Sequence, residues 1–160
     1  MQDSVLDALR GAPNACRAAP NIITGGQPTA AQLAALKAAG GGIVLDIRDP
    51  MEPRPLDEPA EAKAQGLEYV NIPISSGSLS DDKLTRILQV LRGAGERQVF
   101  FHCHSGNRVG GAMIAYLMLD KGVGEEDAIE QAMGMGLRSP EYVEWALDYV
   151  RRHAPPGARA

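Results

Sequence analysis

The sequence is poor in the residue types and charge that build metal sites and nucleic-acid surfaces. Its 160 residues include two cysteines, Cys16 and Cys103, which lie too far apart for zinc-site spacing. The three histidines form no metal-ligand pattern either, so we expect no metal and no cofactor. The net charge of −4 disfavours extensive binding to nucleic acids, although a local basic pocket could still take a small anion.

Apolar segments of membrane length are also missing, and we expect no signal peptide. No segment approaches the length of a membrane span, and the first ten residues contain acidic side chains without an apolar core. We therefore expect a cytoplasmic protein with no membrane partner. The hydrophobic content of 44% and the length predict one globular domain. We place this domain at residues 20–153, after an N-terminal extension (1–19) and before a disordered tail (154–160). The oligomeric state cannot be inferred from sequence.

Strand and helix patterns alternate along the chain. Short apolar runs predict strands at 21–24, 43–47, 67–72 and 99–101, the first of them at a sheet edge. Capping residues and apolar periodicity predict helices after Thr29 and Ser80 and over 58–65, 107–121, 125–135 and 140–153. This alternation is typical of an α/β fold. We expect a mostly parallel central sheet of about four strands flanked by helices.

Residues 99–109 join an apolar strand to a buried helix through a polar turn that holds a cysteine and an arginine. Cys103 enters the turn, and Arg108 follows five positions later. Backbone N–H groups of a tight loop that opens a helix converge on one point and favour negative charge there. This field favours the thiolate form of Cys103, and the planar guanidinium of Arg108 matches a tetrahedral oxyanion. The turn therefore predicts a cysteine nucleophile in a site for an anionic group.

Other polar residues are expected at the same sheet edge, because ligands of such sheets bind beyond the carboxyl ends of the strands. They are Arg48, Asp49 and the loop 75–80. We interpret His102 as a strand-end residue that orients the turn rather than as a general base. Asp46 lies inside a strand and needs a partner, for which we expect a structural ion pair with Arg48. Cys16 has no comparable surroundings and is interpreted as incidental.

The pattern His102-Cys103-x-x-Gly106-x-Arg108 resembles the signature loop of the cysteine-dependent protein phosphatases. Segments 23–28, 32–33, 44–48 and 66–74 resemble the phosphatase-like domain of bacterial beta-lactamase-hydrolase-like proteins. The resemblance covers about residues 20–138. It implies a dual-specificity-phosphatase-like fold, in agreement with the alternating pattern.

The resemblance also implies a role for each residue of the turn. Cys103 would attack phosphorus and carry a phosphocysteine intermediate, with no metal required. The phosphoryl oxygens would be bound by Arg108 and by the backbone of the four residues before it, which are His104, Ser105, Gly106 and Asn107. The partner would be a phosphorylated small molecule or a phosphoprotein. An aromatic content of 4% argues against a deep slot specific for phosphotyrosine.

The turn departs from the phosphatase pattern in three ways. Four residues separate Cys103 from Arg108, where such phosphatases have five, and Val109 replaces their usual serine or threonine. Ser75 and Ser76 stand where the general-acid aspartate is expected, which leaves Asp49, Asp81 and Asp82 as candidate acids and predicts low activity. The shorter turn resembles rhodanese-like sulfurtransferases, which would carry a persulfide on Cys103. A third hypothesis is a non-catalytic anion-binding module.

Overall fold

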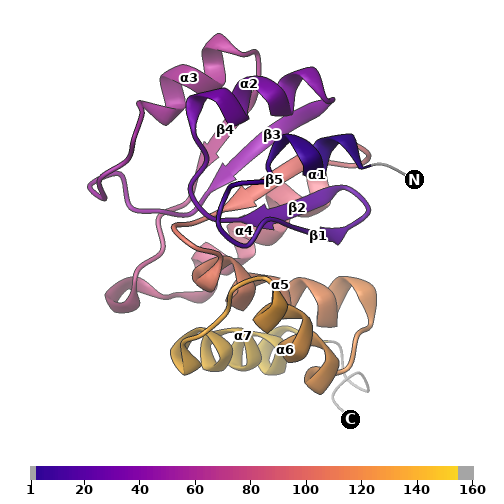
Figure 1. Ribbon diagram of the computed structural model, residues 1–160. Helices are drawn as coiled ribbons and strands as arrows, with labels where there is room; N and C mark the ends of the chain where they lie inside the picture. The colour runs from indigo at the N-terminus through magenta and orange to yellow at the C-terminus, as the bar shows by residue number, and fades with distance from the viewer. Residues whose placement is uncertain (1–2, 155–160) are drawn as a thin grey trace.

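A five-stranded sheet forms the centre of the computed structural model, which describes residues 3–154 (Figure 1). The strands are β1 (Cys16–Ala19), β2 (Ile22–Gly25), β3 (Gly41–Asp46), β4 (Glu68–Asn71) and β5 (Gln98–His102). Their order is β1-β2-β5-β3-β4, and every neighbouring pair is parallel except β1 and β2. The predicted α/β class and mostly parallel sheet are therefore confirmed.

One detail of the predicted sheet was wrong. The strand β2 lies between β1 and β5 instead of at an edge, because a further strand, β1, brings the sheet to five. The missed edge strand, β1, has the sequence Cys-Arg-Ala-Ala, which contains no β-branched or aromatic residue and gives no strand signal. It is held by antiparallel pairing of Cys16 with Thr24 and of Arg17 with Ile23.

Helices cover both faces of the sheet. They are α1 (Ser4–Ala8), α2 (Ala30–Ala38), α3 (Glu58–Ala64), α4 (Asp81–Gly93), α5 (Asn107–Lys121), α6 (Glu125–Gly134) and α7 (Pro140–His153), with a 3₁₀ turn, η1, at Ser76–Ser78. Figure 1 shows α1–α3 on one side and α4–α7 on the other. Side chains alternate along each strand, so Val44 and Phe100 are buried under the first group while Leu45 and Phe101 are buried under the second. The helix predicted after Thr29 is α2, and Thr29 and Gln32 form a capping box at its start.

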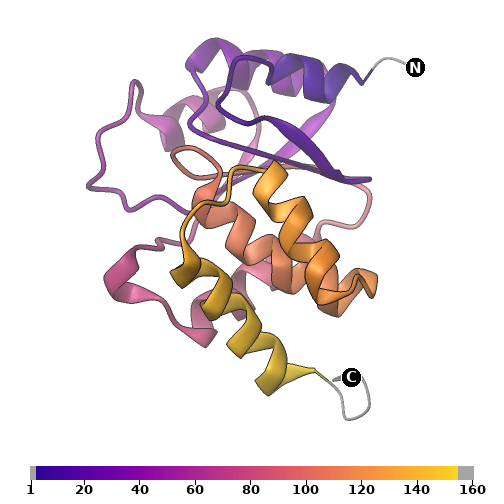
Figure 2. The same ribbon diagram turned by 60° about the horizontal axis from the view of Figure 1, so that its bottom comes forward.

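The helix α5 follows the cysteine turn and is almost wholly enclosed, with residues 109–117 all buried. It packs against both α6 and α7 (Figure 2). Two glycines permit the close approach. A Cβ atom on Gly110 would lie 2.7 Å from Cβ of Leu137, and one on Gly111 would lie 2.7 Å from Cβ of Tyr142. The start of α5 is therefore held in place by residues that follow it in the chain.

The N-terminal segment, expected to be an extension, packs onto the same fold. Val5, Leu9 and Ala12 are buried against the core under α2, and β1 completes the sheet. The predicted disordered tail falls outside the described residues apart from Ala154. Within residues 3–154, no helix is both long and apolar enough to cross a membrane.

Candidate active site

The turn between β5 and α5 wraps around the sulfur of Cys103. Gly106 has a left-handed conformation, with φ of 98°, and α5 begins at the next residue. The N–H of Gly106 donates to Sγ of Cys103 at 3.1 Å, and Cys103 is 1% exposed. A backbone donor at a helix start thus contacts the sulfur directly, which is the arrangement that stabilises negative charge there.

The carbonyl groups of the turn are held by residues outside it. The carbonyl oxygen of His104 accepts from the N–H of Gln27 at 3.0 Å, and that of Ser105 accepts from Nδ2 of Asn14 at 2.6 Å. Because a peptide's N–H and C=O groups point in opposite directions, these anchors favour N–H groups that face the sulfur.

Asn107 ties the start of α5 to the segment between α6 and α7. Its Nδ2 donates to Oγ of Ser139 at 2.9 Å, and its Oδ1 accepts from the backbone N–H groups of Arg138 and Ser139. The turn is therefore fastened to the C-terminal helices as well as to the N-terminal segment.

Replacement of Gly106 by alanine should damage this turn. A Cβ atom there would overlap the carbonyl oxygen of Met135, and the residue has positive φ. We expect Gly106→Ala to lower the free energy of unfolding by about 2–5 kcal/mol, because it adds a clash to left-handed strain. Gly122→Ala is the matched control, since Gly122 has φ of 67° with no atom within 4 Å of its Cβ position. Denaturant unfolding of both variants measures the difference, and equal losses would contradict the predicted clash.

Glu52 holds the guanidinium of Arg108. Its two carboxylate oxygens accept from Nη1 and Nη2 of Arg108, both at 2.8 Å, and Nη1 also donates to the carbonyl oxygen of Ile74 at 2.9 Å. Glu52 also accepts from Nε of Arg48 and from the N–H of Asp49. The bonds from Arg108 outweigh the opposing effect of partial burial and, with those from Asp49 and Arg48, lower the pKa of Glu52 to about 2. Glu52 is therefore a fixed anion at neutral pH.

The geometry leaves one edge of Arg108 for a ligand. A guanidinium has five N–H donors arranged in a rigid fork. Glu52 and Ile74 use both hydrogens of Nη1 and one of Nη2. The donors that remain by this count, Nε–H and one Nη2–H, lie side by side and can bind two oxygens of an anion.

A cavity of about 320 Å³ opens above the sulfur. It is lined by Glu52, Ser75, Ser76, Cys103, His104, Ser105, Asn107, Arg108 and Tyr142. The structure thus brings together Cys103, Arg108 and the predicted loop 75–80. The three candidate acids, Asp49, Asp81 and Asp82, are not among the lining residues. Asp81 instead forms an ion pair with Arg152 and lies 3.0 Å from Nε2 of His153.

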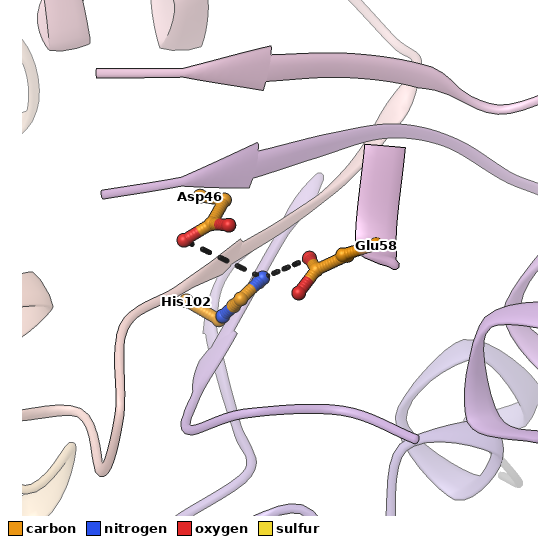
Figure 3. Close-up of side chains that lie close together, drawn as sticks. All are labelled: Asp46, Glu58 and His102. Carbon is orange, nitrogen blue, oxygen red and sulfur yellow. Dashed lines mark hydrogen bonds and ion pairs between the residues drawn. The ribbon is translucent and has the colours of Figure 1, made fainter. Parts of the chain in front are cut away.

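Behind the turn, His102 lies in a buried cluster with two carboxylates (Figure 3). Its Nε2 is 2.5 Å from Oε2 of Glu58 and 3.9 Å from Oδ1 of Asp46. The expected ion pair of Asp46 with Arg48 was wrong. Asp46 pairs with Arg54 at 2.5 Å, because the side chain of Arg48 is drawn to Glu52 and Gln27 instead. Arg48 contacts the Asp46 carboxylate through its backbone N–H and not through its side chain.

Asp46, Glu58 and His102 have the spacing of a metal-ligand set, with ligand atoms within 4.8 Å of one another. The guanidinium of Arg54, however, is within 4.0 Å of both carboxylates, at 2.5 Å from Asp46 and 3.7 Å from Glu58. Arg54 and a protonated His102 balance the two negative charges, so the donor set does not call for a further cation. The cluster is therefore an ion-pair network.

Sequence reasoning missed the residues that reach the turn from afar. Asn14 lies 91 positions from Ser105, which it contacts. Glu52 lies 56 positions from Arg108, and Glu58 lies 44 positions from His102. Gln27 contacts Glu58 across 31 positions. The available signals were weak. Glu58 opens a helix, where carboxylates are common, and Glu52 lies in a proline-rich connection whose path a sequence does not specify.

Comparison with known proteins points to one class of enzyme. Residues 13–141 match the family described as "DSP-PTPase phosphatase fused to NAD+ Kinase". A provisionally assigned phosphatase (DUF442) from Shewanella putrefaciens CN-32 is 18% identical, with a TM-score of 0.81 over 92% of this chain and 98% of that one. A search of the curated proteins finds none that matches this chain.

Two further solved structures share the fold. Tk-PTP in its active form is 20% identical, with a TM-score of 0.77 over 88% of this chain and 98% of that one. TpbA from P. aeruginosa, in complex with phosphotyrosine, is 22% identical, with a TM-score of 0.69 over 91% of this chain and 88% of that one. At these identities the likeness establishes the fold alone. The chemistry has to be argued from the residues of the turn.

Proposed function

The chain belongs to the family described as the DSP-PTPase phosphatase fused to NAD+ kinase, and from that premise we propose that it hydrolyses phosphate monoesters with Cys103 as nucleophile. The observation that carries the proposal is the contact between Sγ of Cys103 and the N–H of Gly106, in a cavity that Arg108 also lines. A sulfur, helix-start donors and a guanidinium meet there, as transfer of a phosphoryl dianion requires.

The reaction would proceed in two displacements. In the first, the Cys103 thiolate attacks phosphorus, an S–P bond forms, and the P–O bond to the leaving group breaks with its electron pair on oxygen. In the second, water attacks phosphorus, the S–P bond breaks, and inorganic phosphate leaves with the thiolate restored. In both steps the free edge of Arg108 and the turn N–H groups would bind the equatorial oxygens as charge develops. Glu52 would keep Arg108 in place throughout.

The proposal is tested with purified, reduced protein. We expect phosphate release from an aryl phosphate and, after a rapid denaturing quench, a phosphorylated peptide that contains Cys103. Transfer of sulfur from thiosulfate to cyanide should not exceed the rate without protein. Sulfur transfer that depends on Cys103, without phosphate release, would refute the phosphatase and identify a sulfurtransferase. The spacing of four residues between Cys103 and Arg108 is the observation that keeps this second candidate under test.

Proton donation to the leaving group is the weak part of this site. Among the lining residues of the cavity, the one carboxylate is Glu52, and its pKa of about 2 keeps it ionised at neutral pH. We therefore expect phosphates of acidic phenols to react about 10²–10⁴-fold faster than alkyl phosphates, since general-acid catalysis typically contributes a factor of that size.

The aspartates supply the control for this prediction. Asp49→Asn, Asp81→Asn and Asp82→Asn should each change kcat by less than about twofold for every substrate. A variant that slows phenyl phosphate far more than p-nitrophenyl phosphate would contradict us and identify that aspartate as the acid.

A further inference from the structure

His102 connects the cysteine turn to a buried carboxylate on another element. Its ring is fully buried, and Nδ1 lies 3.1 Å from the carbonyl oxygen of Cys103. On the other side of the ring, Nε2 lies 2.5 Å from Oε2 of Glu58 (Figure 3). Glu58 is the first residue of α3 and is itself fully buried. One imidazole thus bridges the nucleophile's own peptide and a carboxylate 44 positions earlier in the chain.

The contacts define the protons on this ring. A carbonyl oxygen can only accept, so Nδ1 carries a hydrogen that it donates to Cys103. On the other side, Glu58 also accepts from Nε2 of Gln27 at 2.7 Å and lies 3.7 Å from Nε of Arg54. Both neighbours favour the ionised carboxylate, which leaves the second hydrogen on Nε2 of His102. The ring is then an imidazolium.

The surroundings of the pair support this charge state. Burial opposes both charges, but the hydrogen bond between the two groups and their mutual attraction outweigh it, which lowers the pKa of Glu58 and raises the pKa of His102. From β3, Asp46 adds a second negative charge, which Arg54 and the hydroxyl of Tyr69 on β4 hold in place. The ring of Phe100 stacks on His102 with centroids 5.2 Å apart.

For the Cys103 thiol, the positions of the charges in this cluster matter more than their net charge. Two carboxylates, Asp46 and Glu58, balance Arg54 and the imidazolium. His102 is adjacent to Cys103 in the chain and bonds to its carbonyl group, whereas Glu58 lies on the far side of the ring. The positive end of the network therefore faces the nucleophile, and a nearby positive charge favours a thiolate.

We propose that Glu58 is a positioning residue of this phosphatase, which keeps His102 doubly protonated and so holds a positive charge and a donated hydrogen bond against the peptide of Cys103, in favour of the thiolate. This role rests on the proposed function of Cys103 as nucleophile. It acts through His102 and needs no contact between Glu58 and substrate.

Alkylation of the thiol tests this role without any phosphatase assay. In a Cys16→Ser background, iodoacetamide reports the thiolate fraction of Cys103 as a function of pH. We expect Glu58→Gln, which keeps the shape of the side chain and removes its charge, to raise the pH of half-maximal rate by about one unit. On the acidic limb of the profile alkylation should then be about tenfold slower, with the plateau at high pH unchanged. Glu61→Gln, on the same helix, is the matched control and should behave as the parent.

Two further measurements separate this role from a merely structural one. Nitrogen-15 NMR of His102 should show an imidazolium at pH 7 in the parent and a neutral ring in Glu58→Gln. In a His102→Asn background, Glu58→Gln should produce no further shift of the alkylation profile, since its effect passes through the ring.

Two results would overturn the proposal. They are an unshifted alkylation profile in Glu58→Gln and a neutral His102 in the parent at pH 7. The NMR result on the parent decides the matter even if Glu58→Gln fails to fold. A shifted profile in a protein that releases no phosphate would refute the phosphatase and leave the role of Glu58 intact.

Discussion

Replacement of Cys103 by serine should reduce phosphate release on the order of 10⁴-fold or more, which is the largest effect we expect from any single substitution. The serine hydroxyl is far less acidic than a thiol, so the donor from Gly106 at 3.1 Å and the helix start cannot keep it ionised. No S–P bond can form, and the phosphopeptide that contains Cys103 should disappear. Phosphate release and peptide mass spectrometry are the two measurements.

The same variant separates an enzyme from an anion-binding module. The donors of Gly106 and Arg108 survive in Cys103→Ser, so inorganic phosphate should still bind, as measured by calorimetry. Cys16→Ser is the matched control. Cys16 lies half-buried on β1, where burial raises the pKa of its thiol, and its loss should leave turnover unchanged. If Cys103→Ser retained full phosphate release, another group would be the nucleophile.

Replacement of Arg108 by lysine should lower kcat/KM on the order of 10²–10³-fold, with most of the loss in kcat. Lysine keeps the positive charge but has no planar fork, so it cannot bind both oxygens of Glu52 and two phosphoryl oxygens at once. Steady-state kinetics with p-nitrophenyl phosphate measure the loss. The loss falls on kcat because the equatorial oxygens gain charge in the transition state.

The chain contains a matched control for this substitution. Arg92 also binds a carboxylate through two nitrogens, since its Nε and Nη2 donate to Asp120, but it lies on the surface of α4. Arg92→Lys should leave kcat/KM unchanged within a factor of about two. We propose that one edge of the Arg108 guanidinium binds Glu52 while the other binds the phosphoryl group. If Arg108→Lys retained more than a third of the parent activity, this role would be refuted.

The sequence predicted those parts of the site that are contiguous in the chain. Cys103, Gly106 and Arg108 lie within six residues, and the strand and helix on either side have strong apolar patterns. The bounds of α5, Asn107–Lys121, agree with prediction for the same reason. Helix α7, Pro140–His153, is also as predicted, because a proline and an amphipathic pattern mark it.

The parts that were missed depend on where irregular connections run. The partner of Asp46 was predicted as Arg48, two positions away, whereas Arg54 reaches it across the loop. Glu52 reaches Arg108, and Glu58 reaches His102, only because the connection between β3 and α3 returns toward the end of β5. Proline restricts the backbone of such a segment but does not specify its path, so ion pairs across it cannot be inferred from spacing.

The hydrogen bonds of Asn107 affect when the turn can become ordered during synthesis of the chain. Its bonds to Arg138 and Ser139, and the close fit of Gly106 against Met135, require residues more than 25 positions beyond the turn. Asn14, which holds the other side, was synthesised about 90 residues before Cys103. A growing chain that ends before Ser139 therefore lacks the contacts that hold the turn from its C-terminal side. Its cysteine should behave as an ordinary thiol, and nucleophilic character should appear only when the C-terminal helices dock.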